Sequence, residues 1–337
     1  MHYGIRCFAG ANTAQGFYSC FDSIFTSRKR TFYIKGAPGV GKSGLMKRIA
    51  QRQASFGHEI SYFHCSSDPD SLDGIIDETL NAAMLDATAP HSYDPLYPGA
   101  SGTILSLGDS LNETALEGDI KEIASVSKEI SDAFQSAAKY LSASLFIRKN
   151  AGGETDVLRA RKYAEEIASA FENHFFLSRP RRFFLSAHTA KGLIDFSDQF
   201  SNVTAIEIET PFGESADLLL RIVLEKACMN GVECTVFLDP IDPEILSALY
   251  IPEASMFLTG SSQLHAKHRI TGIFENGKDT AEDRELFDLL VQKTHASLEK
   301  AKKLHDDLER YYTPRMDFSR LVETEARVLK TLDHMNA

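Results

Sequence analysis

Residues 31–43, TFYIKGAPGVGKS, decide the fold of this chain. The stretch starts with an apolar, β-branched and aromatic run at residues 32–34, which is typical of a buried strand. A helix-forming segment, GLMKRIAQRQA, follows from Gly44. Between them, GAPGVGKS matches the pattern GxxxxGK[ST] of a phosphate-binding (Walker A) loop. Because strand, glycine-rich loop and helix occur in this order, we interpret the stretch as such a loop and not as a plain turn.

Each residue type in this loop has a chemical reason. Three glycines let the backbone curl with its N–H groups pointing at an anion, and the start of the following helix adds its own unpaired N–H groups. We expect Lys42 to reach the β- and γ-phosphates and the Ser43 hydroxyl to bind Mg²⁺. The predicted cofactors are therefore ATP and Mg²⁺. The predicted binding residues are Gly36, Ala37, Pro38, Gly39, Val40, Gly41, Lys42, Ser43 and Gly44.

Acidic residues downstream complete the predicted site. Residues 81–86, NAAMLD, are an apolar run that ends in an acid, and we expect Asp86 at this strand tip to hold Mg²⁺ together with Ser43. A second strand is predicted over residues 58–65, followed by a loop, SSDPDSLDG, that contains Asp73. Lys42, Asp86 and Asp73 are the catalytic candidates. For Asp73 we favour the alternative that it is a solvated loop acid. His64, in the predicted second strand, is a further candidate for chemistry, and for it we favour the alternative of a strand-end histidine without a catalytic role.

A long helical stretch follows a connector rich in proline and glycine. Its apolar residues recur near heptad spacing between residues 120 and 145, and after the break KNAGGETD a second helix is predicted over residues 157–171. We expect the two helices to form a hairpin that packs on its own domain. An arm that binds a partner protein is the alternative.

An internal repeat sets the domain organisation. Residues 182–198, RFFLSAHTAKGLIDFSD, match residues 6–22, with Phe184 opposite Phe8, and the match continues beyond the phosphate loop into a second pair of predicted helices. We therefore predict an N-terminal half, residues 1–178, and a C-terminal half, residues 179–337. The predicted fold class is α/β, with two tandem P-loop NTPase-like three-layer α/β/α domains of mostly parallel sheets, each with a helical hairpin.

The C-terminal half has lost the phosphate-loop signature. Its residues 209–215, ETPFGES, read as one residue shorter than residues 36–43. The positions that we pair are Glu209 with Gly36, Phe212 with Gly39, Glu214 with Lys42 and Gly260 with Asp86. A carboxylate in place of the lysine would repel a triphosphate. The prediction is that this half does not bind a nucleotide in the usual manner.

Composition limits the partners. The chain has 337 residues, of which 43% are hydrophobic and 25% charged, as in a globular protein long enough for two domains. A formal charge of −11 makes nucleic acid an unlikely partner. The five cysteines have no metal-ligand spacing, and no apolar run reaches eighteen residues. We expect a cytoplasmic protein with reduced thiols and no membrane span.

Several stretches together resemble a family of bacterial, mostly Gram-positive, tandem P-loop proteins that are labelled ATPases or nucleotide kinases. They are FAGANTAQGF, GAPGVGKSGLMKRI, YFHCSSDPDSLDG and DATAPH followed by YPG, and the resemblance covers nearly the whole chain. It implies ATP binding and hydrolysis but no particular substrate. The family's second half commonly carries a phosphate loop too, and this chain departs from it at Phe212 and Glu214.

Three functions remain open at this stage. The first is a Mg²⁺-dependent ATPase, although no acid directly follows Asp86 to orient water. The second is a kinase for a nucleotide or small molecule, with Arg148, Arg159 and Arg161 as cations that could fold over the phosphates. The third is a nucleotide-dependent switch or scaffold that binds a protein partner through the helical hairpins or the degenerate half. A DNA-dependent motor is disfavoured by the charge.

Overall fold

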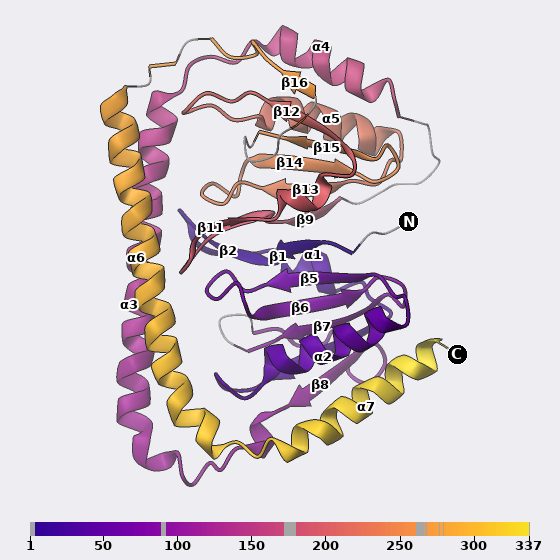
Figure 1. Ribbon diagram of the computed structural model, residues 1–337, viewed down its shortest axis with the longest axis vertical. Coiled ribbons are helices and arrows are strands. Elements are labelled where there is room, and N and C mark those ends of the chain that lie inside the picture. Colours follow the sequence, from indigo (N-terminus) through magenta and orange to yellow (C-terminus); the bar gives the residue numbers. More distant parts are fainter. Residues whose placement is uncertain are drawn as a thin grey trace.

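The computed structural model describes residues 4–88, 92–171, 180–260, 266, 268–275, 277–278 and 280–336. Two α/β halves follow one another along the long axis of the molecule, and two long helices run beside both of them (Figure 1). None of the helices in the described part of the chain combines the length and the apolar character that crossing a lipid bilayer requires.

The N-terminal half is built on a six-stranded sheet with the order β1-β5-β6-β7-β4-β8. All neighbouring strands are parallel except β6, which runs antiparallel to both β5 and β7. The elements are β1 (Arg6–Phe8), β2 (Gly10–Thr13), β3 (Gly16–Ser19), α1 (Phe21–Phe25), β4 (Arg30–Lys35), α2 (Lys42–Ser55), β5 (Ile60–His64), β6 (Leu72–Asp77), β7 (Ala82–Asp86) and β8 (Gly102–Ser106).

The C-terminal half repeats this plan in the same order, β9-β13-β14-β15-β12-β16, with β14 as the antiparallel strand. Its elements are β9 (Arg181–Phe183), β10 (Ser186–Thr189), β11 (Gly192–Asp195), β12 (Thr204–Ile208), α5 (Asp217–Met229), β13 (Thr235–Leu238), β14 (Leu246–Ile251), β15 (Met256–Thr259) and β16 (His268–Ile270). Short 3-10 helices are η1 (Gly108–Ser110), η2 (Glu117–Asp119), η3 (Ser197–Phe200) and η4 (Thr313–Arg315). Both halves are thus α/β, with mixed and mostly parallel sheets.

Strand β6 is the first difference from the expected structure. The turn-forming and acidic residues of segment 66–74 predict a loop. In the structure its last residues, from Leu72, belong to a strand that is buried along its whole length. Leu72, Ile75 and Ile76 are in the hydrophobic core. Burial of these three side chains outweighs the weak strand propensity of Asp73 and Gly74 between them.

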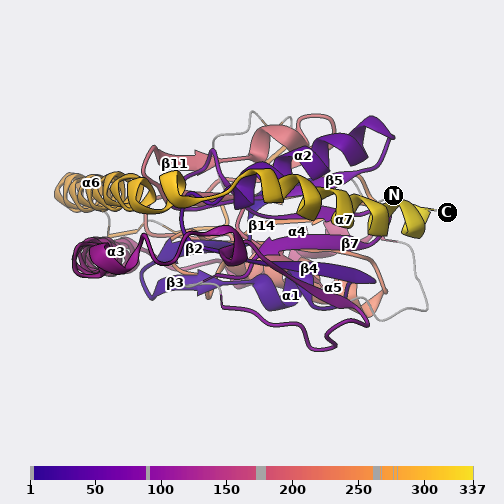
Figure 2. The same ribbon diagram turned by 90° about the horizontal axis from the view of Figure 1, so that it is seen from below.

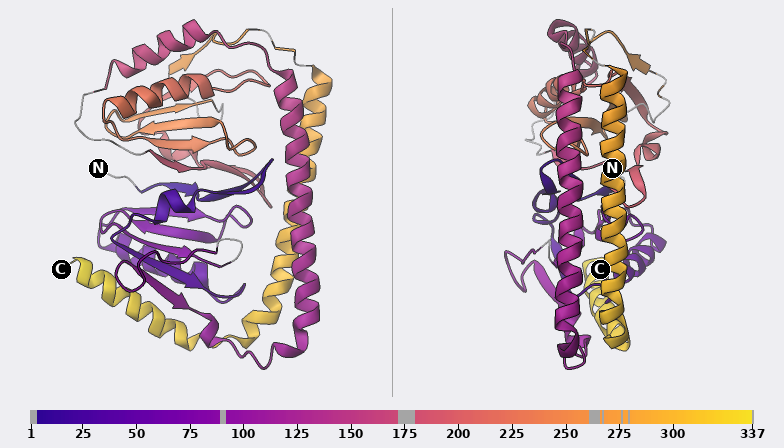
Figure 3. Two further views of the ribbon diagram at one scale, coloured as in Figure 1. Left: turned by 180° about the vertical axis from the view of Figure 1, so that it is seen from behind. Right: turned by 90° about the vertical axis from the view of Figure 1, so that its left-hand side faces the viewer.

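The long helices give the second difference. Helix α3 (Ile120–Ala151) runs antiparallel to α6 (Ala281–Tyr312), as the right-hand view of Figure 3 shows, while α4 (Val157–Ala168) packs on α5 and α7 (Ser319–Asn336) packs on α2. The expected hairpin on each half is therefore wrong. Each 32-residue helix is about 48 Å long at 1.5 Å per residue, which carries the chain from one half to the other. The two halves exchange their second helices.

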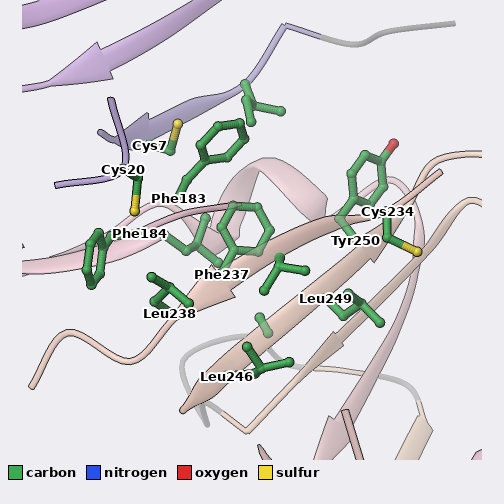
Figure 4. Close-up of a cluster of buried hydrophobic side chains, with 14 of the residues drawn as sticks. Cys7, Cys20, Phe183, Phe184, Cys234, Phe237, Leu238, Leu246, Leu249 and Tyr250 are labelled. Atoms are coloured by element: carbon green, nitrogen blue, oxygen red, sulfur yellow. The ribbon is translucent and has the colours of Figure 1, made fainter. Parts of the chain in front are cut away.

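The halves also share a core where β1 and β9 meet. Phe183 lies against Phe63 with ring centroids 5.4 Å apart, and both side chains are fully buried. Figure 4 shows Cys7 and Cys20 of the N-terminal half in one cluster with Phe183 and Phe184. All five cysteines are free thiols. Residues 172–179, which contain the predicted boundary, lie outside the described residues.

A buried ion pair crosses the same boundary. Arg181 donates from Nη1 to Glu78 Oε1 at 2.8 Å, and Arg28 approaches the other oxygen of the same carboxylate at 3.2 Å. The two guanidinium groups hold the pKa of Glu78 below its usual range, against the opposing effect of burial. The ion pair between Glu78 and Arg181 thus helps to hold the two halves together.

Candidate nucleotide-binding site

The loop between β4 and α2 has the backbone shape that its glycines suggest. Gly39 and Gly41 have positive φ angles of 71° and 90°, in the left-handed region that glycine tolerates best. A Cβ on Gly36 would lie 2.8 Å from Val40 Cγ2, so a side chain there would displace the loop. The buried side chain of Val40 anchors the middle of the loop, and Gly44 lies in the first turn of α2.

Lys42 is the first residue of α2, and its ammonium turns back over the loop. Its Nζ donates to the carbonyl oxygens of Gly36 at 2.7 Å and Ala37 at 2.9 Å. The same atom lies 3.4 Å from Asp86 Oδ2, at the end of β7. Because β4 and β7 are parallel neighbours, with Ile34 opposite Asp86, their carboxyl ends bring the lysine and the acid together. The structure thus places these two predicted site residues side by side.

Thr88 ties the end of β7 to the start of the loop. Its backbone N–H donates to Asp86 Oδ1 at 3.0 Å, and its hydroxyl lies 3.1 Å from both the N and the O of Gly36. The carboxylate of Asp86 is therefore oriented by a backbone bond on one oxygen and by Lys42 near the other. Sequence reasoning missed Thr88, although its place two residues after the predicted strand tip was a usable signal.

Ser43 and Asp73 join this group through strand β6. Ser43 Oγ accepts the backbone N–H of Leu72 at 3.0 Å, which places the hydroxyl next to the start of the strand. Asp73 is the following residue and only 5% exposed. Burial and then the negative charge of Asp86 raise the pKa of Asp73 to about 7, although a hydrogen bond with Cys65 and the charge of Lys42 oppose the rise. The favoured interpretation of Asp73 as a solvated loop acid is wrong.

Helices from the C-terminal half cover the loop, which the sequence analysis did not foresee. Thr313 Oγ1 donates to Gly39 O at 3.3 Å. A Cβ on Gly39 would meet that hydroxyl and would lie 3.1 Å from Glu309 Cβ, while a Cβ on Gly41 would lie 3.0 Å from Leu321 Cδ1. Figure 2, seen from below, shows α7 crossing near α2. The end of α6, η4 and the start of α7 therefore form one wall of the candidate site.

The predicted arginine cluster lies elsewhere. Arg148 makes two hydrogen bonds to Asp239 of the C-terminal half, at 2.9 and 3.0 Å. Arg159 donates to the carbonyl oxygen of Gly272, and Arg161 is exposed on α4. Because Arg148 and Arg159 contact the C-terminal half, and Arg161 lies on the helix that packs on α5, the prediction that these arginines fold over phosphates at Lys42 is wrong. The cause is the length of α3, which carries its C-terminal end from the N-terminal half to the C-terminal half.

His64 lies between the two halves. Its Nδ1 is 2.7 Å from the carbonyl oxygen of Pro69, and its ring lies 4.7 Å from that of Phe196. Burial lowers the pKa of this imidazole, which favours the neutral form. These contacts place His64 in the packing of the interface.

The loop of the C-terminal half shows that the sequence pairing was one residue off. Asp217 Oδ1 accepts the backbone N–H of Leu246 at 2.7 Å, as Ser43 Oγ accepts that of Leu72, and Leu246 is the repeat partner of Leu72. Positive φ recurs at Gly213 (92°), which makes it the equivalent of Gly39. The loop is therefore TPFGESAD, residues 210–217, and is as long as GAPGVGKS.

This register changes which residues of the C-terminal loop are equivalent to the predicted phosphate-binding residues. The equivalent of Lys42 is Ala216, and the equivalent of Gly36 is Thr210, so the assignment of Glu214 to the lysine position is wrong. Pairing Glu209 with Gly36 also sets Pro211 opposite Pro38, and this single proline match is the source of the false gap. Glu214 instead accepts a hydrogen bond from the backbone of Gly153, after α3. Neither register puts a lysine in this loop.

No cluster of three or more histidine, cysteine or acidic side chains arranged to hold a metal ion occurs within the described ranges. A comparison of the chain with protein-family models, with curated proteins and with solved structures found no match.

Proposed function

We propose that the N-terminal half binds a nucleoside triphosphate with Mg²⁺ at residues 36–43 and hydrolyses it slowly. The observation that carries this proposal is the position of Lys42, whose ammonium lies on two loop carbonyls and beside Asp86 at the tip of the neighbouring strand. An ammonium in that position can exchange these oxygens for phosphate oxygens. We also propose that both halves are P-loop domains of the tandem family that the sequence resembles.

The residues of the loop and of the neighbouring strand tip fit a nucleoside triphosphate and Mg²⁺. Positive φ at Gly39 and Gly41 lets the backbone curl without side chains, and α2 begins at the end of the loop. The N–H groups in the first turn of a helix are available to bind an anion. Ser43 and Asp86 would hold Mg²⁺, which keeps several waters and phosphate oxygens as its other ligands and so needs few protein ligands. The ion would neutralise charge that develops on the phosphates.

Asp73 is our candidate for the group that moves a proton, because it follows Leu72, whose backbone N–H donates to Ser43 Oγ. A pKa of about 7 lets its carboxylate accept a proton from water near neutral pH, as a general base does. It lies in the same charged group as Lys42 and Asp86, both of which shift its pKa. The residues after Asp86 are Ala87 and Thr88, so no glutamate follows the strand tip. We therefore expect low turnover by the isolated protein.

One observation favours the switch as a second candidate function. The wall formed by Thr313, Glu309 and Leu321 belongs to the C-terminal half, whose own loop has no lysine. Any movement of the N-terminal loop on nucleotide binding would therefore reach α6 and α7. Turnover that rises on addition of a protein partner would support this role. Robust turnover by the protein alone would contradict it.

Thermal melting of the full chain with Mg²⁺ and each of ATP, GTP and ADP tests the proposal. A ligand present at a hundred times its dissociation constant stabilises the folded state by about 2.7 kcal/mol. Lys42→Ala should abolish the shift, whereas Glu214→Ala, in the other half, should change it little. No shift with any nucleotide, or an equal loss in both variants, would contradict it. Transfer of labelled phosphate to an acceptor other than water would identify a kinase.

A further inference from the structure

Helix α6 presents a charged face to the candidate site. Lys302, His305 and Glu309 lie three and four residues apart, which places them on one side of a helix. At one end of this face Glu309 is close to Gly39 of the loop. At the other end Lys302 Nζ lies 3.4 Å from Asp68 Oδ2, in the segment between β5 and β6, and it also pairs with Asp306.

Electrostatic effects connect this face to Lys42. Burial lowers the pKa of His305, and the positive charges of both Lys302 and Lys42 lower it further, against Glu309. On the other side, the charge of Asp68 contributes to the raised pKa of Asp73, which also responds to Lys42 and Asp86. Geometry places Lys302 at the rim of the candidate site, because its partner Asp68 accepts the hydroxyl of Ser71 at 3.2 Å, one residue before the Leu72 N–H that donates to Ser43.

The long helix of the other half, α3, provides an internal comparison. Helices α3 and α6 both have 32 residues, and each ends against the loop of the opposite half, with Gly152 near Gly213 and Thr313 near Gly39. Counting back from these equivalent ends, Lys302 corresponds to Leu141, which is fully buried. Lys302 thus has no cation at the equivalent position of α3; Asp242, the repeat partner of Asp68, pairs instead with Lys149 near the C-terminal end of that helix, at 2.7 Å.

We propose that Lys302 is a phosphate-binding residue that the C-terminal half supplies to the loop of the N-terminal half. Its ammonium leaves Asp68 and Asp306 and contacts the terminal phosphate of a bound nucleoside triphosphate. The proposal rests on the proposed function, because it assigns a second cation to the same site. A triphosphate with Mg²⁺ retains net negative charge, and a lysine's flexible four-carbon stem suits a change of partner. Binding of a triphosphate, but not of a diphosphate, would then release Asp68 from α6.

Calorimetric titration of the full chain with Mg²⁺-ATP and Mg²⁺-ADP tests this. Loss of one charge-assisted hydrogen bond corresponds to about tenfold weaker binding or more. Lys302→Met should weaken ATP binding by about that factor and leave ADP binding within about twofold, while Lys302→Arg should retain most of the affinity. The matched control is Lys303→Met, because Lys303 is the next residue but is 71% exposed and pairs with Glu299.

Asp68→Asn separates a phosphate contact from a structural role. This variant removes the ion pair but keeps Lys302, so the preference for ATP over ADP should persist. If Asp68→Asn loses that preference, if Lys302→Met weakens both nucleotides equally, or if Lys302→Met matches Lys303→Met, the inference is overturned. Failure of the wild type to bind, or binding unchanged in Lys42→Ala, would instead overturn the proposed function and the inference with it.

Discussion

Phe8 and Phe184 join the two halves through both of their backbone groups. Phe8 N–H donates to Phe184 O at 2.8 Å, and Phe184 N–H donates to Phe8 O at 3.0 Å. The two residues hold the same position in the repeat, and a residue can pair reciprocally with its own copy only at a local two-fold axis. The halves are therefore related as the subunits of a symmetric dimer are, within one chain.

Truncating a phenylalanine beside this axis should destabilise both halves together. Phe183 is fully buried and packs on Phe63 of the other half, so Phe183→Ala should cost about 3–5 kcal/mol of unfolding free energy. Urea denaturation followed by circular dichroism measures the loss. Phe146→Ala, at a site 67% exposed on α3, is the control and should change stability by no more than about 0.5 kcal/mol. Equal effects of the two substitutions would argue against a shared core.

A side chain on Gly39 should separate α6 from the loop. Gly39→Ala meets both an unfavourable φ angle and the atoms of Thr313 and Glu309, so we expect nucleotide binding to be lost. Gly57→Ala is the control for backbone strain, because Gly57 has a similar φ of 85° and open space around it, and it should cost about 1–2 kcal/mol without affecting the nucleotide. Removing the hydroxyl with Thr313→Ala should restore part of the binding to Gly39→Ala. Melting with and without Mg²⁺-ATP measures all three effects.

Asp73 should make the protein less stable as the pH rises. Its folded-state pKa of about 7 lies above the ordinary value of 3.8, so the folded state binds more protons than the unfolded state between those values. Stability should therefore fall by up to about 1.4 kcal/mol per pH unit from pH 4 to pH 7, and Asp73→Asn should remove this contribution. Urea titrations at pH 5, 6 and 7 measure the slope. Asp70→Asn, on the exposed part of the same segment, should leave it unchanged.

His188 should act in the opposite direction. It lies on β10 with Nδ1 2.9 Å from His295 Nε2 on α6, and burial followed by the charge of His295 lowers its pKa to about 3. The unfolded chain binds the proton at the ordinary value of 6.5, so stability should be lost as the pH falls below 6.5, by up to about 1.4 kcal/mol per unit.

The repeat supplies the variant for this test. Asn12 holds the equivalent position in the N-terminal half, so His188→Asn introduces a side chain that the fold already accommodates there. This variant should lose the bond to His295 but show a flatter stability profile between pH 5 and 6.5. A profile parallel to that of the wild type would mean that another group carries the acid sensitivity.

The sequence predicted what depends on neighbouring residues. Strand, loop and helix around Lys42 follow from local pattern, and the nearness of Asp86 follows from the parallel strands that such a unit builds. The buried strand β6 could not be read from SSDPDSLDG, because its strand state depends on β5 and β7 on either side. The register of the second loop was misjudged because one shared proline outweighed a pattern that only the hydrogen bonds of Asp217 and Leu246 reveal.

The partners of the long helices could not be predicted either. Apolar periodicity indicates which face of a helix is buried, but it does not indicate which surface covers that face. The buried residues of α6 and α7 were recognised as amphipathic patterns, and either half could have received them. The wall over the candidate site, Thr313 above all, depends on this choice and was therefore missed.

Helix α7 makes the core of the N-terminal half depend on the C-terminal repeat. Leu321, Val328 and Leu332 complete the core around Ile34 and Leu45 in the opposite half. Deleting the C-terminal repeat would remove this support from the loop before α2 and leave apolar surface open to solvent. A substitution that unfolds the C-terminal repeat would therefore also expose the N-terminal core, whether or not that repeat binds a ligand of its own.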